Sequence, residues 1–186
     1  KHLAADNEQG FVDELLDGQP DAHAYFSRMK KQNVAGPKVL GRRKPVEETS
    51  TQSLAQYVAD DAVTFVDTRP VGEVHEGAVT NAINLPNPSK IASHGAWVID
   101  PETDSRPVTV LAGGAEEAED LRNHLVRVGI DNVTSYVTSI SRLPVETPRV
   151  VSPADLSKFD ASMVLDVRNK SEHAAGHVPG SHQLSA

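Results

Sequence analysis

A motif that occurs twice constrains the fold of this 186-residue chain more than any other feature. Each copy is an apolar run followed by Asp-x-Arg, then Glu, Gly and Val at fixed spacing. The two copies are offset by 99 positions. They contain Asp67, Arg69, Glu73, Gly77 and Val79, and then Asp166, Arg168, Glu172, Gly176 and Val178. Because so many residue types recur at the same spacing, the pattern indicates a duplicated domain.

From Val46 onward, short apolar runs alternate with segments of helical periodicity. The pattern predicts strands over 62–66, 82–85, 107–111 and 133–137. It also predicts one helix capped by Ser50 or Thr51 and another over 116–128 that Gly129 ends. A strand, a crossover helix and a parallel strand form the βαβ unit. We therefore expect an α/β fold with an open parallel sheet and helices on both faces.

The segments on either side of this region differ from it. Residues 6–33 have the pattern of two helices, the second capped by Asp21 and carrying Tyr25, Phe26 and Met29 on one face. The second copy of the motif begins after a proline-bearing linker, and a repeat of ~100 residues is longer than the segment between this linker and Ala186. The predicted organisation is a helical tail and linker over 1–44, a complete domain over 45–144 and the N-terminal half of a second domain over 145–186.

Composition excludes several classes of function. The chain has no cysteine, so thiol nucleophiles, disulfides and thiolate metal sites are absent. The net charge is -8, and residues 46–186 hold twenty acidic against ten basic residues. Such an acidic body does not favour nucleic-acid binding, and we expect the basic run over 38–44 to be a solvated linker. No stretch approaches ~18 apolar residues and no signal-peptide pattern opens the chain, so we expect no membrane segment and a cytoplasmic location.

The second copy of the motif carries a family resemblance. Asp166-Val167-Arg168, Glu172 and Gly176-His177-Val178-Pro179-Gly180 resemble the first signature of the rhodanese-like family. The first copy, through Asp67, Arg69, Glu73 and Gly77, is similar. The resemblance implies a rhodanese-like sheet domain, with a nucleophilic cysteine directly after the central strand and at the amino end of a helix. The resemblance also implies that Asp and Arg pair at the strand end.

This sequence departs from the rhodanese pattern in the catalytic loop. Counting back from Gly129 places Ala112 at the cysteine position. Where active members of the family have Gly, a basic residue and Ser or Thr, this loop has Ala115, Glu117 and Ala118. We therefore expect a naturally inactive domain with no catalytic residue. An active sulfurtransferase mutated at Ala112 is the less favoured interpretation.

A second resemblance covers nearly the whole chain. Phe11-Val12, residues 15–20, Tyr25-Phe26, residues 29–33 and Gly36-Pro37, together with residues 95–101, resemble a class of bacterial fusion proteins. In these proteins a metallo-β-lactamase-fold domain, related to hydrolases or persulfide dioxygenases, precedes rhodanese domains. The resemblance implies an upstream metallo-β-lactamase-fold domain as partner. No H-x-H-x-D-H run occurs here, so we expect the metal site of such a protein to lie outside this chain and expect no cofactor within it.

Other interpretations stay open at this stage. The loop formed by Ala112, Gly113, Gly114 and Ala115 follows a predicted strand and precedes a helix, so it is a candidate anion or small-molecule site. His173, His177 and His182 have a spacing that suits a metal, but no carboxylates accompany them and we expect none bound. We expect Trp97 to be buried in the core or between domains. The sequence favours a non-catalytic scaffold that contacts the metallo-β-lactamase-fold domain or a second copy of itself.

Overall fold

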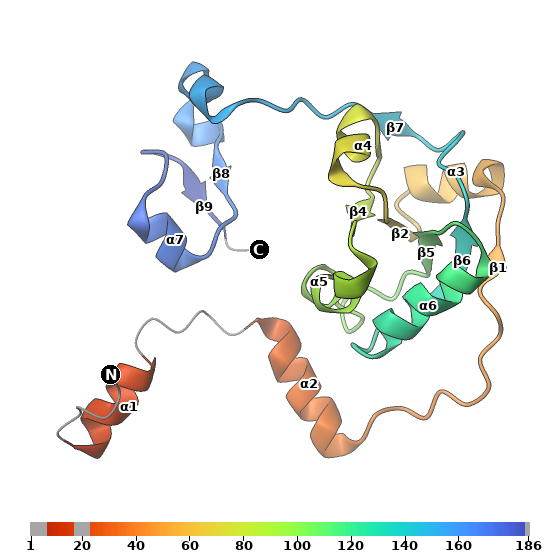
Figure 1. The fold of residues 1–186 in the computed structure, drawn as a ribbon, viewed down its shortest axis with the longest axis horizontal. Coiled ribbons are helices and arrows are strands. Elements are labelled where there is room, and N and C mark those ends of the chain that lie inside the picture. Colours follow the sequence, from red (N-terminus) through yellow and green to blue (C-terminus); the bar gives the residue numbers. More distant parts are fainter. Residues whose placement is uncertain (1–6, 17–22, 185–186) are drawn as a thin grey trace. The chain divides into compact units, whose positions relative to one another are not determined.

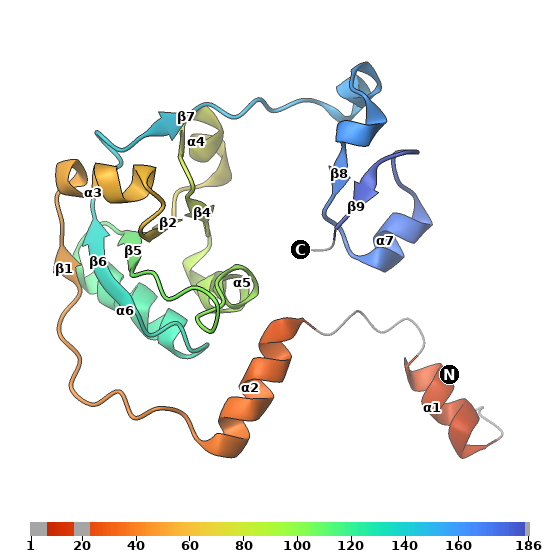
Figure 2. The same cartoon turned by 180° about the vertical axis from the view of Figure 1, so that it is seen from behind.

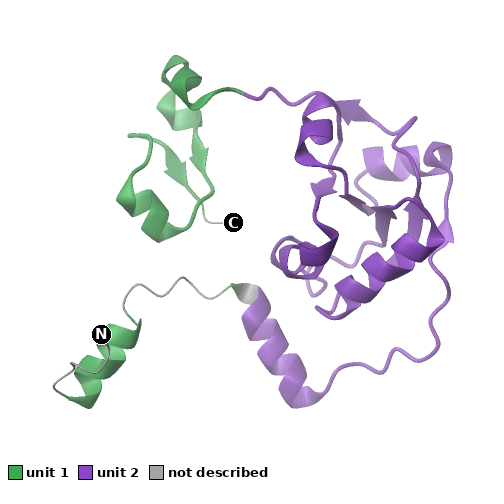
Figure 3. Cartoon of the chain, in the orientation of Figure 1, with its two compact units in different colours: residues 1–23, 151–186 green, residues 24–150 purple. Residues whose placement is uncertain are grey.

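The computed structural model describes residues 7–16 and 23–184. Residues 24–150 form one compact unit, and the described residues on either side are grouped apart from it (Figure 3). The first copy of the repeat lies within this unit and the second copy lies outside it. The domain limits drawn from the sequence, 1–44, 45–144 and 145–186, stay predictions.

A five-stranded parallel sheet forms the centre of residues 24–150 (Figure 1). Its spatial order is β1 (Glu47–Glu48), β6 (Val133–Val137), β5 (Val108–Leu111), β2 (Thr64–Asp67) and β4 (Ile83–Asn84). Every neighbouring pair runs parallel. The predicted α/β class with an open parallel sheet is confirmed. The edge strand β1 was not predicted from the sequence, because two glutamates carry no strand signal.

Helices cover both faces of this sheet. Helix α3 (Thr51–Ala59) lies on one face, and α5 (Ile91–Val98) and α6 (Ala115–Val126) lie on the other (Figures 1 and 2). The predicted cap is present: the Ser50 hydroxyl accepts a hydrogen bond from the Ser53 N–H at 3.1 Å. Helix α5, which follows the short 3₁₀ turn η2 (Pro88–Lys90), was not predicted.

Two apolar clusters, one on each face, hold these layers together. The α5 and α6 side contains Val66, Val108, Val110, Leu121 and Leu125, all at most 1% exposed. The α3 side contains Leu54, Val58, Phe65, Leu111 and Val137. Central parallel strands buried on both faces have continuous apolar sequences, which is why 107–111 was recognisable as a strand.

One glycine sets the distance between α5 and α6. A Cβ atom at Gly95 would lie 2.9 Å from the Leu125 side chain, closer than such atoms approach in proteins. The two helices can therefore pack this closely only because residue 95 has no side chain. Trp97 lies on the same helix with 53% of its surface exposed, so it does not belong to the core of residues 24–150, and the alternative that it lies between domains stays a prediction.

Smaller elements complete the unit. Helix α4 (Val71–Glu76) follows β2, and the antiparallel pair β3 (Ala78–Val79) and β7 (Val145–Glu146) lies at its end. Helix α2 (Ala24–Ala35) also belongs to this unit. Arg28 of α2 is only 4% exposed, and its Nη1 donates to the Asp100 carboxylate at 2.6 Å. The backbone N–H of Glu102 first, and then Arg28, hold the pKa of Asp100 below its usual value.

The remaining described residues contain α1 (Glu8–Leu16) and the second copy of the motif. That copy comprises the 3₁₀ turns η3 (Pro153–Lys158) and η4 (Ala161–Met163), then β8 (Leu165–Asp166), α7 (Lys170–Ala175) and β9 (His182–Gln183). Strands β8 and β9 form a two-stranded parallel sheet. Asp21, the predicted cap of the second helix, lies outside the described residues. Within residues 7–16 and 23–184, no helix has the length and apolar character that crossing a membrane requires.

Candidate functional site

The Asp-x-Arg motif forms a clamp at the carboxyl end of β2. Asp67 ends the strand and is 1% exposed. The Arg69 backbone N–H and Nε donate to Asp67 Oδ1, both at 3.0 Å, and Arg69 Nη2 donates to Oδ2 at 2.6 Å. Nη2 also donates to the Gly77 carbonyl at 2.8 Å, so the guanidinium fastens the end of α4 to the strand. The hydrogen bond to Asp67 raises the pKa of Arg69, so this ion pair persists at physiological pH.

The second copy reproduces this clamp. The Arg168 backbone N–H and Nε donate to Asp166 Oδ1 at 3.0 and 2.9 Å, and its Nη2 donates to Oδ2 at 2.6 Å. Nη2 also donates to the Gly176 carbonyl at 2.8 Å. Glu172 belongs to a capping box with Asn169 at the start of α7. Glu73 occupies the counterpart position in the first turn of α4.

A third Asp-x-Arg clamp lies outside the repeat and was missed in the sequence. Asp104 and Arg106 precede β5, and the Arg106 backbone N–H and Nε donate to Asp104 Oδ1 at 3.0 and 2.9 Å. Arg106 also pairs with Asp61. The hydrogen bond from Arg106 lowers the pKa of Asp104 to about 2. The signal was present as Asp-Ser-Arg, but without the following Glu and Gly it did not match the repeated pattern.

The Asp67 carboxylate is the centre of the clamp at the end of β2. Both carboxylate oxygens of Asp67 accept hydrogen bonds from Arg69, and the Asp67 side chain is buried. Through Arg69, this carboxylate joins the end of β2 to the Gly77 carbonyl at the end of α4.

The predicted catalytic loop begins where β5 ends. Ala112 follows Leu111, is 3% exposed and donates its backbone N–H to the Val137 carbonyl at 3.0 Å. Its side chain is a buried methyl group that has no reactive atom. The Thr68 hydroxyl donates to the Leu111 carbonyl at 2.7 Å, which ties this loop to the end of β2.

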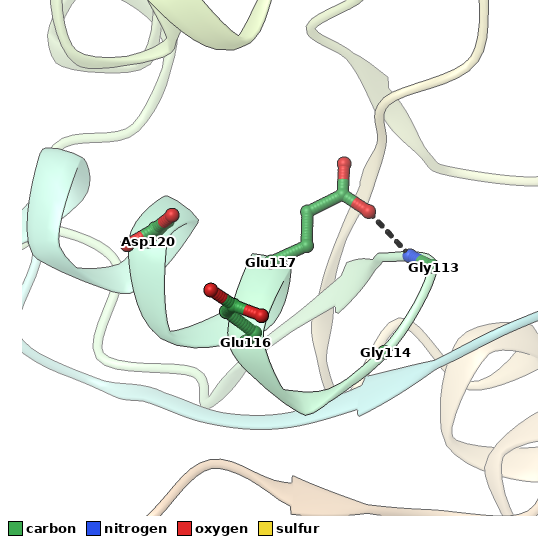
Figure 4. Close-up of a pocket in the computed structure, with 5 residues that line it drawn as sticks. All are labelled: Gly113, Gly114, Glu116, Glu117 and Asp120. Carbon is green, nitrogen blue, oxygen red and sulfur yellow. Dashed lines mark hydrogen bonds between the residues drawn. The ribbon is translucent and has the colours of Figure 1, made fainter.

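The next residues form the start of α6, where the predicted ligand loop lies. The Gly113 N–H donates to Glu117 Oε2 at 2.6 Å (Figure 4). Gly114 caps α6 without a side-chain hydrogen bond, and Ala115 is the first helical residue. A carboxylate at a helix start is favourable because the helix dipole is positive there. Glu117 thus places a negative charge of this chain on a backbone donor that would otherwise be available to an external anion.

A cavity of about 430 Å³ opens at this loop. It is lined by Gly113, Gly114, Glu116, Glu117 and Asp120. Glu116 and Asp120 lie one helical turn apart on α6 (Figure 4). The backbone donors at the helix start attract anions, whereas the three carboxylates repel them. Of the two alanines that the sequence grouped with these glycines, Ala112 precedes them at the end of β5 and Ala115 follows them as the first residue of α6.

The three histidines of the second copy are arranged differently from a metal site. His173 and His177 stack with ring centroids 3.8 Å apart, and a hydrogen bond of 2.9 Å joins His177 Nδ1 to the His173 carbonyl. His182 lies on β9. Over residues 7–16 and 23–184, no cluster of three or more His, Asp or Glu side chains is placed to hold a metal ion.

Comparisons with known proteins give likenesses of structure only. No protein-family model matches the sequence, and no curated protein sequence matches it either. Among solved structures, a metallo-beta-lactamase from Staphylococcus aureus subsp. aureus COL matches 71% of this chain, with 20% identity and a TM-score of 0.54. The chain spans 35% of the length of that protein. At this identity, the match is a likeness of fold.

Two further structures are similar over parts of the chain. A rhodanese-related protein from Thermoplasma volcanium matches 55% of this chain and 99% of its own, with 18% identity and a TM-score of 0.43. An EanB variant in complex with ergothioneine matches 75% of this chain and 41% of its own, with 19% identity and a TM-score of 0.41. The structural neighbours thus include a metallo-beta-lactamase and a rhodanese-related protein, and no sequence relative establishes a fusion of the two.

Proposed function

We propose that residues 45–144 form a non-catalytic rhodanese-like domain that serves as a structural and interaction scaffold. One observation carries this proposal: the end of the central strand presents the buried methyl group of Ala112, and Glu117 occupies the adjacent backbone N–H of Gly113. A sulfurtransferase needs a thiolate at that place and a neighbourhood that stabilises negative charge. This loop has no thiol, because Ala112 stands at that place. Its cavity is lined by three carboxylates, which do not stabilise a further negative charge.

The partner we propose is a metallo-β-lactamase-fold domain. The likeness of fold to the Staphylococcus aureus protein and the resemblance of residues 11–37 to the end of such a domain support this proposal. In this view the metal-dependent chemistry, a hydrolase or persulfide dioxygenase reaction of sulfur metabolism, belongs to the partner domain. The scaffold would then hold that domain in a bacterial cytoplasmic enzyme and needs no cofactor of its own.

The direct test is a thiosulfate:cyanide sulfurtransferase assay of the purified chain. We expect no turnover, because no side chain in the loop can accept a sulfur atom. Ala112→Cys restores only the thiol, and we expect it to stay inactive because Glu116, Glu117 and Asp120 still repel thiosulfate. Ala115→Cys, at the exposed first residue of α6, is the matched control for a non-specific thiol reaction. Turnover by the unaltered chain would exclude the proposal.

The scaffold role itself is tested on the partner domain. A metallo-β-lactamase-fold domain with residues 45–144 of this chain attached is compared with the same domain alone. We expect the attached form to unfold at a higher temperature with an unchanged kcat, because a scaffold acts through contact area and not through the reacting atoms. An unchanged unfolding temperature with a changed kcat would indicate a catalytic contribution instead.

A second function is favoured by the helix start at the loop. The first N–H groups of α6 have no partner within the helix, and Gly113 and Gly114 line the cavity in front of them. An anion or small-molecule module would use these donors. Calorimetric titration with phosphate, sulfate and thiosulfate tests it, with Glu117→Gln as the variant that removes the competing charge. Heat with the unaltered chain would favour this function, and its absence in both proteins would exclude it.

A further inference from the structure

A pair of hydroxyl groups interrupts the apolar layer between the sheet and α3. Alternate residues of a strand face opposite sides of the sheet. Val108 and Val110 pack on the α5 and α6 side, so Thr109 between them lies on the face that α3 covers (Figure 2). Thr109 is 1% exposed, and a hydrogen bond of 2.9 Å joins its hydroxyl to the hydroxyl of Ser135 on β6. A buried polar pair therefore stands where the α3 cluster would otherwise continue.

The bond between these two hydroxyls leaves one of their protons unused. Each hydroxyl has one proton to donate, and a single hydrogen bond joins the pair. Within residues 7–16 and 23–184, neither hydroxyl makes a second hydrogen bond. Whichever of Thr109 and Ser135 donates to the other, the proton of the second hydroxyl has no acceptor. Such a buried donor is unfavourable, so the pair can donate to an acceptor that is placed against it.

A cavity of about 300 Å³ opens against the hydroxyl pair. Thr109 and Ser135 line it together with Leu54 of α3, an apolar side chain that is 4% exposed. Pro107 also lines the cavity, which therefore lies at the amino end of β5, whereas the loop at Gly113 follows the carboxyl end. Small-molecule sites have volumes of about 300–1,000 Å³. The cavity is thus separate from the loop and has room for a molecule of one ring.

An irregularity in β6 shapes this cavity. Val108 of β5 lies opposite Val133. The next residue, Thr109, lies opposite Ser135, so Thr134 is an extra residue in β6. In a regular strand two successive residues face opposite sides of the sheet, but Thr134 and Ser135 both line the cavity. Bulges of this kind redirect side chains and are frequent beside functional sites.

The lining of the cavity is uncharged. The described residues that line it include no charged side chain, although 24% of the residues in the chain are charged. Tyr57, an exposed residue of α3, adds an aromatic ring, and Thr49 and Ser53 add further hydroxyls. An ion placed here would lose hydration without gaining a charged partner. The lining therefore suits an uncharged molecule.

We propose that this space, which we call the Thr109 cavity, binds a small uncharged molecule that has one ring and one oxygen acceptor. The ring lies against Leu54, Val63 and Tyr57, because apolar and aromatic side chains favour such contact. The oxygen accepts the proton that Thr109 and Ser135 leave unused. The site is independent of the scaffold role, since none of its residues belongs to the loop at the carboxyl end of β5.

Benzyl alcohol is the probe, and the readout is the NMR shifts of the backbone amides in the full chain. We expect saturable shifts at Leu54, Thr109 and Ser135 and none at Gly113. Absence of saturable shifts at the first three residues would overturn the proposal.

Two related probes test the chemistry of the ligand. Toluene has the same ring without the oxygen, so we expect it to bind about tenfold more weakly. Benzoate has the ring with a negative charge, and we expect no saturable shift with it because no cation lines the cavity. Benzoate or toluene that binds as tightly as benzyl alcohol would overturn the proposal.

A double variant removes the hydroxyl pair. Either hydroxyl alone still has a proton to donate, so Thr109→Val and Ser135→Ala are combined. We expect the affinity for benzyl alcohol to fall about tenfold, to that of toluene, while the affinity for toluene does not fall. Retained toluene binding separates a lost hydrogen bond from a lost fold.

The matched control combines Thr138→Val with Ser27→Ala, two exposed hydroxyls that do not line the cavity. We expect both affinities to stay unchanged. An equal loss of benzyl alcohol binding in the control, or no loss in the Thr109→Val and Ser135→Ala protein, would overturn the proposal.

Discussion

The two copies of the repeat make the same local bonds in different surroundings. Both Asp-x-Arg clamps have Nη2 to carboxylate distances of 2.6 Å and Nη2 to glycine carbonyl distances of 2.8 Å. Yet the arginine side chain is 16% exposed in the first copy and 46% exposed in the second. Local sequence is therefore sufficient for the clamp, whereas burial depends on the strand and helices that pack around the first copy.

The largest expected effect comes from breaking the buried clamp. Asp67→Ala leaves the guanidinium of Arg69 without its partner in a mostly buried place, so we expect a loss of about 3–5 kcal/mol in the free energy of unfolding. Asp166→Ala removes the same bonds at the exposed clamp, and we expect no measurable change in the unfolding of residues 24–150. Urea denaturation followed by circular dichroism compares the two. Equal losses would show that burial does not separate the copies.

A second pair of substitutions tests the apolar surroundings. Leu85→Ala creates a cavity beside β2 and should cost about 2–5 kcal/mol. Leu184→Ala, at the counterpart position, removes a side chain that is 65% exposed, so we expect a change within about 0.5 kcal/mol. Hydrogen exchange of the backbone amides in β2 measures the effect of Leu85→Ala, and hydrogen exchange in β8 measures the effect of Leu184→Ala. A large effect of Leu184→Ala would mean that this side chain is already covered in solution.

The exposure of the arginine in the third clamp lies between those of the two copies, since the Arg106 side chain is 34% exposed. The pKa of Asp104 is about 2, below the ~3.9 of an unfolded chain. A lowered pKa stabilises the fold above about pH 4, and this stabilisation is lost as the pH falls toward about 2.

Arg106→Gln should therefore destabilise the domain by about 1 kcal/mol or less at pH 7, and the difference from the unaltered protein should shrink as the pH approaches 2. Urea midpoints between pH 2 and pH 7 measure it. Arg127→Gln, an exposed arginine near the end of α6, is the control. A difference that does not vary with pH would mean that Arg106 acts through packing alone.

The smallest effect concerns the exposed clamp by itself. The hydrogen bond from Arg168 lowers the pKa of Asp166 to about 2. Arg168→Gln should raise this pKa toward the ordinary value of ~3.9 without changing the unfolding of residues 24–150. Carboxyl chemical shifts followed by NMR titration measure it. If the pKa stays near 2, the backbone N–H of residue 168 holds the carboxylate without the guanidinium.

Much of the fold followed from local pattern. The strands at 107–111 and 133–137 were predicted within a residue because central parallel strands are apolar on both faces. Strand β1 was missed because Glu47 and Glu48 have a low intrinsic preference for strands. They form a strand because they pair with β6. The antiparallel pair β3 and β7 was missed for the same reason, since Ala78 pairs with Glu146, a residue far along the chain.

The candidate site could also be predicted from the sequence only in part. Ala112 and the two glycines could be placed at the end of a strand by counting along the chain. The bond between Glu117 and the Gly113 N–H could not, because it depends on how α6 leaves the sheet. The exposure of Trp97 could not be predicted either. An isolated tryptophan is usually buried, and only the placement of α5 decides which side chains face α6.

The sequence by itself determined the duplication, the alternation of strands and helices, the absence of a thiol and both clamps of the repeat. The duplication and the missing thiol are read directly from the residue types, and the alternation and the clamps depend on residues within about twenty positions of one another and on backbone geometry that such short segments can specify. The tertiary structure alone decided that one clamp is buried while its twin is exposed, that Glu117 occupies the loop, and that β8 has an edge unpaired by any described strand. Burial and strand pairing are properties of the neighbours that a segment meets in space, and a local pattern does not contain those neighbours.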